Sequence, residues 1–188
     1  MVGFSRGAAA AREFLNRVDD LSRQGYYRWA TGGQCVRVIP RFAGLFDTVL
    51  SANTDFNMRM GIPESVRYVA HAVAVNEHRA LFPLESIEDR YGAPGSDANR
   101  VERGFVGAHG DIGGGYTVQD GSDLSDVALQ WMWQQAAAQG VRVDSLAAPL
   151  QVVSHPVVHD ERRAVLWRTL WQMQPTPELA DRRVVYRA

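Results

Sequence analysis

The feature that most constrains this chain is a serine between two glycines, Gly3-Phe4-Ser5-Arg6-Gly7, close to the first residue. The pattern Gly-x-Ser-x-Gly is typical of a strand that turns sharply into a helix and holds the serine on a strained backbone at the apex. Glycines are expected on both sides because the strand and the helix come too close there to accommodate a Cβ atom. The pattern therefore predicts a short strand over residues 1–4 and an accessible serine at the turn.

The residues after the motif favour a helix over residues 6–23. A run of alanines from Ala8 to Ala11 has high helix propensity, and small side chains let a helix pack closely against a sheet. Four larger apolar residues recur at helical spacing and predict one buried face: Phe14, Leu15, Val18 and Leu21. The alternative interpretation is an ordinary turn in which the Ser5 side chain caps the helix.

Composition excludes several classes of protein. The chain has 188 residues, with 46% hydrophobic and 22% charged residues, which is enough for one domain with a substantial core. Its net charge of −1 argues against a dedicated nucleic-acid-binding protein. A single cysteine, Cys35, excludes an internal disulfide and a multi-cysteine zinc site. With no membrane-length apolar run and no signal-peptide pattern, we expect the protein to be cytoplasmic at synthesis.

Short apolar runs alternate with helical patterns along the chain. Residues 42–46 form a continuous apolar run that is typical of a buried parallel strand, and residues 100–106 predict another strand. Between them, residues 63–79 show helical spacing of valines and alanines, and the polar residues 84–99 favour a surface loop. A helix is expected over residues 123–139. This alternation predicts an α/β fold with a mostly parallel sheet and flanking helices.

The last part of the chain has a weaker pattern. Residues 165–171 favour an amphipathic helix and residues 184–186 a short terminal strand. We expect residues 1–188 to form a single, partial catalytic domain, with residues 120–188 as its helical C-terminal portion. Four tryptophans are expected to serve core packing rather than membrane contact: Trp131, Trp133, Trp167 and Trp171.

Three residues could form the catalytic triad of a serine hydrolase, and they follow along the chain in the order serine, aspartate, histidine. A serine hydrolase needs a histidine that takes the serine proton and a carboxylate that orients this histidine. Asp47 ends the predicted strand 42–46, and His109 follows the predicted strand 100–106. Because parallel strands present their carboxyl ends at one edge of a sheet, we expect Ser5, Asp47 and His109 to meet there.

Each of these residues also has a structural interpretation. Asp47 could cap a helix, and His109 could be a loop histidine bonded to backbone. Asp111 competes for the carboxylate role, but it is so close to His109 in sequence that we favour it as a brace for the loop through backbone N–H groups.

The glycine-rich stretch Gly113-Gly114-Gly115 lacks the Lys-Ser/Thr of a phosphate-binding loop, so we assign these residues to support of the same loop. His71 and His78 lie seven residues apart on the predicted helix, but their spacing does not match a metal motif. Neither a metal ion nor a cofactor is expected, and no role is assigned to His159.

Four blocks of sequence resemble a known family. They are Gly3–Ala8, Gly44–Val49, Ala74–Arg79 and the segment Gly107–Tyr116. In order and spacing they are similar to the class-one lipase effectors of type VI secretion systems and their uncharacterised α/β-hydrolase relatives. The resemblance covers roughly residues 1–120.

The resemblance implies an α/β-hydrolase-like domain with Ser5, Asp47 and His109 as a catalytic triad. It implies phospholipase activity on an ester or phospholipid substrate, delivery by a type VI system to a rival cell's envelope, a secretion spike as partner and a cognate immunity protein. It also implies that strands carrying a Gly-Thr-x-Asn-like loop precede the elbow, so we expect an N-terminal segment to be missing from this sequence. The backbone N–H of Arg6 is then the evident oxyanion donor.

Two other interpretations stay open at this point. The chain could be a catalytic-domain fragment that needs a separate N-terminal piece. It could also be a non-catalytic binding module built on a hydrolase scaffold.

Overall fold

The computed structural model describes residues 1–24, 38–50, 57–79, 82–89, 99–117, 123–144, 157–159 and 184–187. The elements follow in the order β1 (Val2–Phe4), α1 (Arg6–Arg23), β2 (Ala43–Phe46), β3 (Val69–Ala74), β4 (Leu84–Asp89), β5 (Arg100–Phe105), α2 (His109–Gly113), α3 (Asp123–Ala138) and β6 (Val184–Arg187). Strands β1, β2, β3 and β5 form one parallel sheet in that order, and β4 pairs with β6 in a second, two-stranded parallel sheet. The predicted α/β class with a parallel sheet and flanking helices is confirmed.

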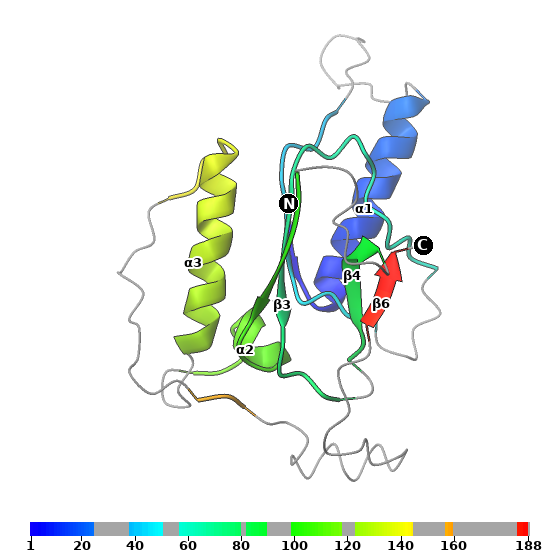
Figure 1. The fold of residues 1–188 in the computed structure, drawn as a ribbon. Helices are drawn as coiled ribbons and strands as arrows, with labels where there is room; N and C mark the ends of the chain where they lie inside the picture. The colour runs from blue at the N-terminus through cyan, green and yellow to red at the C-terminus, as the bar shows by residue number, and fades with distance from the viewer. Residues whose placement is uncertain are drawn as a thin grey trace.

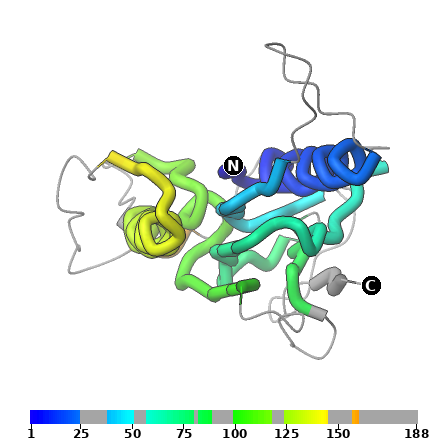
Figure 2. The backbone as a smooth tube through the Cα atoms, turned by 90° about the horizontal axis from the view of Figure 1, so that it is seen from above, coloured from blue at the N-terminus to red at the C-terminus, as the bar shows by residue number. Residues whose placement is uncertain are grey.

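Helices α1 and α3 lie on opposite faces of the four-stranded sheet (Figures 1 and 2). On one face, α1 packs Ala8, Ala11 and Leu15 against apolar residues of β2 and β3. On the other face, Trp131 and Met132 of α3 pack against the alternate residues of the same strands. A strand that is buried on both faces does not alternate between polar and apolar residues, which explains the continuous apolar run over residues 42–46.

The inward face of α1 differs from the expected one. Leu15 and Val18 are buried as predicted, but Phe14 and Leu21 are exposed, at 52% and 43% of their surface. Alanines take their place: Ala8, Ala9 and Ala11 face the sheet. The small side chains let the helix approach the sheet closely, and only Phe14 and Leu21 were assigned to the wrong side.

Two predicted elements are wrong. Residues 69–74, expected in a helix over 63–79, form the buried central strand β3. Residues 84–89, expected in a surface loop over 84–99, form strand β4, in which Leu84, Glu85, Ser86 and Ile87 are buried. The polar residues of β4 are buried because partners from other elements satisfy them, and no local pattern reveals such partners.

Arg12 is one of these partners and ties β4 to helix α1. Its guanidinium is buried and donates to three backbone carbonyls, those of Met60 at 2.6 Å, Glu85 at 2.7 Å and Ser86 at 3.2 Å. Hydrogen bonds from a charged donor are among the stronger ones in proteins. Arg12 therefore links β4 to α1 through its long side chain.

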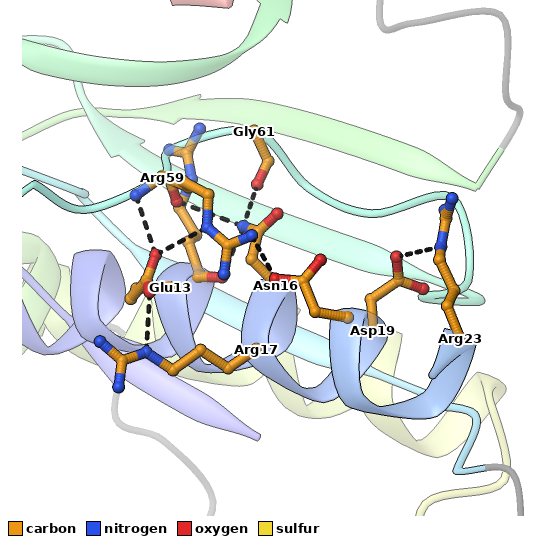
Figure 3. Close-up of polar contacts among 9 residues, drawn as sticks. Glu13, Asn16, Arg17, Asp19, Arg23, Arg59 and Gly61 are labelled. Carbon is orange, nitrogen blue, oxygen red and sulfur yellow. Dashed lines mark hydrogen bonds and ion pairs between the residues drawn. The ribbon is translucent and has the colours of Figure 1, made fainter. Parts of the chain in front are cut away.

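A polar cluster on the outer side of α1 holds the segment before β3 (Figure 3). Arg59 lies across the helix and contacts Glu13 Oε2 at 3.2 Å and Asp20 Oδ2 at 2.6 Å. Asn16 donates to the carbonyl of Gly61 at 2.7 Å, and Arg17 pairs with Glu13 at 2.8 Å. These contacts fix residues 59–61 against the helix.

The other predicted elements in the described residues are confirmed: α1, β2, β5, α3 and the terminal strand β6. Trp131 lies in the core, as expected. Cys35, the predicted helix 165–171 and two of the tryptophans lie outside the described residues. Within the described part of the chain, no helix is both long enough and apolar enough to span a bilayer.

Candidate active site

The carboxyl ends of the four parallel strands meet at one edge of the sheet, and the predicted site residues lie there. Ser5 follows β1, Asp47 follows β2, and His109 begins helix α2 just after β5. Glu77 lies three residues beyond the end of β3. This is the edge at which α/β proteins place their binding sites, because the loops after the strands converge on it.

Ser5 occupies a strained turn between β1 and α1. Its φ of 57° and ψ of −127° are unusual for a residue with a Cβ atom, and such conformations cost about 1–3 kcal/mol each and concentrate at functional sites. Its backbone N–H donates to the carbonyl of Phe46 at 2.9 Å, which fixes the turn beside the end of β2. The Ser5 side chain makes no capping hydrogen bond to α1, so the simple N-cap interpretation does not hold.

The two glycines of the motif have different roles. A Cβ atom on Gly3 would lie 2.5 Å from the carbonyl oxygen of Gly7 and 2.8 Å from the Cα of Ala8, so strand and helix touch there. A Cβ atom on Gly7 would meet nothing within 4 Å. The expectation that both positions exclude a side chain is therefore correct for Gly3 and wrong for Gly7.

His109 and Asp47 form a buried pair. His109 Nδ1 lies 2.6 Å from Asp47 Oδ2, and Asp47 is 0% exposed. The second oxygen of Asp47 accepts the backbone N–H of Ala74 at 2.9 Å, which fixes the carboxylate. Asp47 itself adopts φ of 41°, and residues 48–50 are not helical, so it does not cap a helix. Because an ionised carboxylate only accepts, Nδ1 carries the imidazole proton and Nε2 is left as a base.

Aromatic rings hold the imidazole in place. The ring of Phe4, which directly precedes Ser5, lies 4.5 Å from the His109 ring between centroids. Phe82 meets the same imidazole edge-on at 5.0 Å. The contact with Phe4 places His109 next to the turn that carries Ser5.

A buried ion pair lies behind His109. Glu77 is 1% exposed, and its carboxylate accepts the Nε and Nη2 hydrogens of Arg79 at 2.9 and 2.7 Å and the backbone N–H of His109 at 3.2 Å. Burial by itself would raise the pKa of Glu77, but the hydrogen bonds and charge of Arg79 outweigh it and lower this pKa. The Arg79 guanidinium also stacks on the Phe82 ring at 3.7 Å. Sequence reasoning assigned no role to this pair.

Asp111 pairs with a different histidine. Its carboxylate accepts the backbone N–H groups of Ala108 at 2.8 Å and His159 at 3.0 Å, and it lies 2.6 Å from His159 Nδ1. The His159 ring stacks on Tyr116 with centroids 3.6 Å apart. Asp111 therefore braces the segment that carries His109, while Asp47 contacts the His109 imidazole.

Residues 109–113, expected in a loop, form the short helix α2, and Gly114 and Gly115 follow its end. Gly113 ends α2 against the Phe4 ring, where a Cβ atom would collide with ring carbons. Gly114 caps α2 with a φ of 80°, and the N–H of Gly115 donates to the carbonyl of Gly110 at 2.9 Å. Arg6 is the first residue of α1, where backbone N–H groups have no acceptor within the helix.

The helix expected to carry His71 and His78 on nearly one face does not form. His71 lies within β3 and His78 lies in the segment after it, so they do not share a helix face. Within the part of the chain that the structure describes, no group of three or more His, Cys, Asp or Glu side chains is arranged to hold a metal ion.

Comparison with known proteins gives the family. The profile described as "T6SS, Phospholipase effector Tle1-like, catalytic domain" matches residues 26–135, which include Asp47 and His109. The chain belongs to this family. The predicted resemblance to type VI lipase effectors is thereby confirmed.

Two solved structures are similar to this Tle1-like domain. An uncharacterized protein from Pseudomonas aeruginosa is 31% identical with a TM-score of 0.57, over 80% of this chain and 24% of the other. A Tle1 effector bound to the VgrG spike of the type VI secretion system is also 31% identical, with a TM-score of 0.42, over 59% of this chain and 23% of the other. The chain thus spans about a quarter of the length of either protein. No protein with a curated description matches significantly.

Proposed function

We propose that this Tle1-like domain is a serine esterase of the phospholipase type, with Ser5 as nucleophile, His109 as general base and Asp47 as the residue that orients His109. The observation that carries the proposal is the 2.6 Å contact between His109 Nδ1 and Asp47 Oδ2 beside the strained Ser5 turn. Membership of a phospholipase effector family supports a lipid ester as the substrate.

In the first half of the reaction, Ser5 Oγ attacks the carbonyl carbon of the ester while its proton moves to His109 Nε2. Asp47 stabilises the resulting imidazolium through the Nδ1 hydrogen bond and does not itself become protonated. The tetrahedral intermediate then collapses, and His109 gives the proton to the departing alcohol oxygen. The acyl group stays on Ser5 Oγ.

In the second half, a water molecule attacks the acyl carbon and passes a proton to His109. Collapse of this intermediate breaks the bond to Ser5 Oγ, returns the proton to Ser5 and releases the carboxylic acid. The backbone N–H of Arg6, at the first position of α1, is the proposed oxyanion donor, because it follows the nucleophile and points out of the helix start. A single donor of this kind is worth on the order of a hundredfold in rate.

A fluorophosphonate probe tests the nucleophile. We expect covalent labelling of the folded protein at Ser5, located by mass spectrometry of the labelled peptide. Ser5→Ala should abolish labelling, whereas Ser22→Ala, near the other end of the same helix, should leave it unchanged. Equal labelling of wild type and Ser5→Ala would reject Ser5 as the nucleophile.

Vesicles of defined phospholipid composition test the substrate class. Release of a fatty acid and a lysophospholipid, absent with Ser5→Ala, would support phospholipase activity, and the retained chain would give the position cleaved. Hydrolysis of short esters without hydrolysis of vesicles would restrict the domain to esterase activity.

For the whole protein we propose delivery by a type VI system, with a secretion spike and an immunity protein as partners. Family membership supports this proposal. Co-purification of the full-length protein with a VgrG spike protein, and protection of target cells by a candidate immunity protein, are the direct tests. If neither interaction is detected, the proposal is rejected.

A further inference from the structure

A third histidine–carboxylate pair is buried in the sheet, next to the strand end that carries Asp47. His71 lies in β3, is 0% exposed, and its Nδ1 is 2.8 Å from Oε2 of Glu102 in β5. The two residues are direct neighbours in the parallel register of β3 and β5. The proposed mechanism does not use either of them.

The hydrogen bonds of His71 fix where its proton lies. The backbone N–H of Thr48 donates to His71 Nε2 at 3.1 Å, and the Thr48 hydroxyl lies 3.0 Å from the same nitrogen. A backbone N–H can only donate, so Nε2 carries no proton. The single imidazole proton is therefore on Nδ1, where it is donated to Glu102.

Glu102 is held as an acceptor by its own surroundings. Ser86 Oγ donates to Oε1 at 2.7 Å, and the backbone N–H of Ile87 donates to Oε2 at 2.9 Å. Burial would raise the pKa of Glu102, but the hydrogen bonds from His71, Ile87 and Ser86 outweigh it and lower this pKa. An ionised Glu102 selects the tautomer in which His71 Nε2 can accept the Thr48 N–H.

Thr48 connects this buried pair to the candidate active site. The peptide N–H that His71 receives belongs to the bond between Asp47 and Thr48, so it fixes the ψ angle of Asp47. On the other side, the Thr48 carbonyl accepts the backbone N–H of Glu85 at 2.9 Å. Asp47 has a left-handed φ of 41°, a conformation that a residue with a side chain keeps only when neighbours impose it.

We infer that His71 is a positioning residue for catalysis: through the Thr48 N–H it holds Asp47 in the left-handed conformation that aims its carboxylate at His109. This inference rests on the proposed triad. Glu102 contributes by keeping the proton on the far side of the imidazole. Glu102 thus orients His71 in the same way as Asp47 orients His109.

Two substitutions separate the two hydrogen bonds of His71. The side-chain oxygen of Gln reaches the place of Nε2 and can accept the Thr48 N–H, so His71→Gln keeps the bond to Thr48. The side-chain nitrogen of Asn reaches only the place of Nδ1, so His71→Asn keeps the bond to Glu102 and loses the bond to Thr48. Comparison of the two variants therefore separates loss of the hydrogen bond to Thr48 from loss of the hydrogen bond to Glu102.

We expect His71→Asn to lower kcat about tenfold or more with KM nearly unchanged, since a small misplacement of a catalytic group is costly in the transition state. His71→Gln should keep kcat within about threefold of the wild type, because the bond that fixes Asp47 is retained. A general loss of structure would lower both variants together. Equal kcat values for folded His71→Asn and His71→Gln would overturn the inference.

Nuclear magnetic resonance tests the inference without any turnover. In the wild type, ¹⁵N shifts of His71 should show a protonated Nδ1 and an unprotonated Nε2, and a protonated Nε2 would overturn the inference even if no variant folds. The low-field proton of the His109–Asp47 hydrogen bond should shift in His71→Asn and stay in place in His71→Gln. If the wild type neither hydrolyses esters nor labels at Ser5, the proposed function fails, while these resonances still decide whether His71 positions Asp47.

Discussion

His109 and Asp47 lie 62 residues apart in sequence, yet His109 Nδ1 is 2.6 Å from Asp47 Oδ2 and both residues are buried. Strand β3 separates the strands that carry them, and its last residue, Ala74, donates its N–H to the other oxygen of Asp47. The geometry thus depends on the order of three neighbouring strands.

Removing the charge of Asp47 tests this relationship directly. Asp47→Asn keeps the size of the side chain but can present an amide N–H to His109, which favours the wrong tautomer. By analogy with serine-protease triads, we expect kcat for a soluble ester to fall by about 10³- to 10⁴-fold. Asp126→Asn on helix α3 is the matched control and should behave as wild type. A fall of less than about tenfold for Asp47→Asn would remove Asp47 from the triad.

The contact between Gly113 and Phe4 predicts a steric coupling between α2 and the serine turn. Gly113→Ala should destabilise the protein by about 1–3 kcal/mol, because the added methyl group overlaps the Phe4 ring. In a Phe4→Ala background the same change should cost at least about 1 kcal/mol less. Urea denaturation of the four proteins of this cycle gives the coupling energy, and additive effects would contradict the contact.

The motif glycines predict opposite outcomes for the same substitution. Gly3→Ala should prevent formation of the turn, because the new Cβ would meet the backbone of Gly7 and Ala8. Gly7→Ala has open space and should stabilise the helix by about 0.5–1 kcal/mol. Thermal unfolding together with fluorophosphonate labelling measures both effects. Equal loss of labelling in the two variants would show that Gly7 is also required.

The buried pair Glu77–Arg79 predicts a large cost for removing one charge. Glu77→Gln removes the carboxylate charge that pairs with the Arg79 guanidinium, whose side chain is 12% exposed. We expect a loss of about 3 kcal/mol in the free energy of unfolding, and partial recovery in Glu77→Gln/Arg79→Met, which removes both charges. Chemical denaturation at neutral pH measures this difference. If the double variant is no more stable than Glu77→Gln, the main contribution of Glu77 is the hydrogen bond that it accepts from the His109 backbone N–H.

The surface cluster on α1 predicts a pH dependence of stability. Hydrogen bonds from Arg17 and from the backbone and side chain of Arg59 lower the pKa of Glu13 from 4.5 to about 2. The unfolded chain therefore binds the proton more readily between these values, so the contribution of Glu13 is full above pH 4.5 and is lost as pH falls toward 2.

Urea denaturation between pH 3 and pH 6 measures this effect. Glu13→Gln should flatten the fall of stability below about pH 4.5, and the difference should shrink at high salt because the cluster is on the surface. Identical pH profiles for Glu13→Gln and the wild type would contradict the prediction.

Local pattern was sufficient where an element has one buried side, a clear start or stop residue, or a short continuous apolar run. The glycine–serine turn, helix α1, the apolar run of β2, strand β5 and helix α3 followed from short windows of sequence. Strand β3 was predicted as a helix because a strand buried on both faces shows no alternation, and its valines also fit helical spacing. Strand β4 was predicted as a loop because Glu85 and Ser86 are polar, although both are buried.

The sequence by itself determined the family and the order of a serine, an aspartate and a histidine at the ends of parallel strands. It also predicted the pairing of His109 with Asp47, but it did not predict the carboxylate partners of His71 and His159. The tertiary structure pairs His109 with Asp47, His71 with Glu102 and His159 with Asp111. These pairs depend on strand order and register, which are set by packing between residues far apart in the chain and leave no signal in a local window.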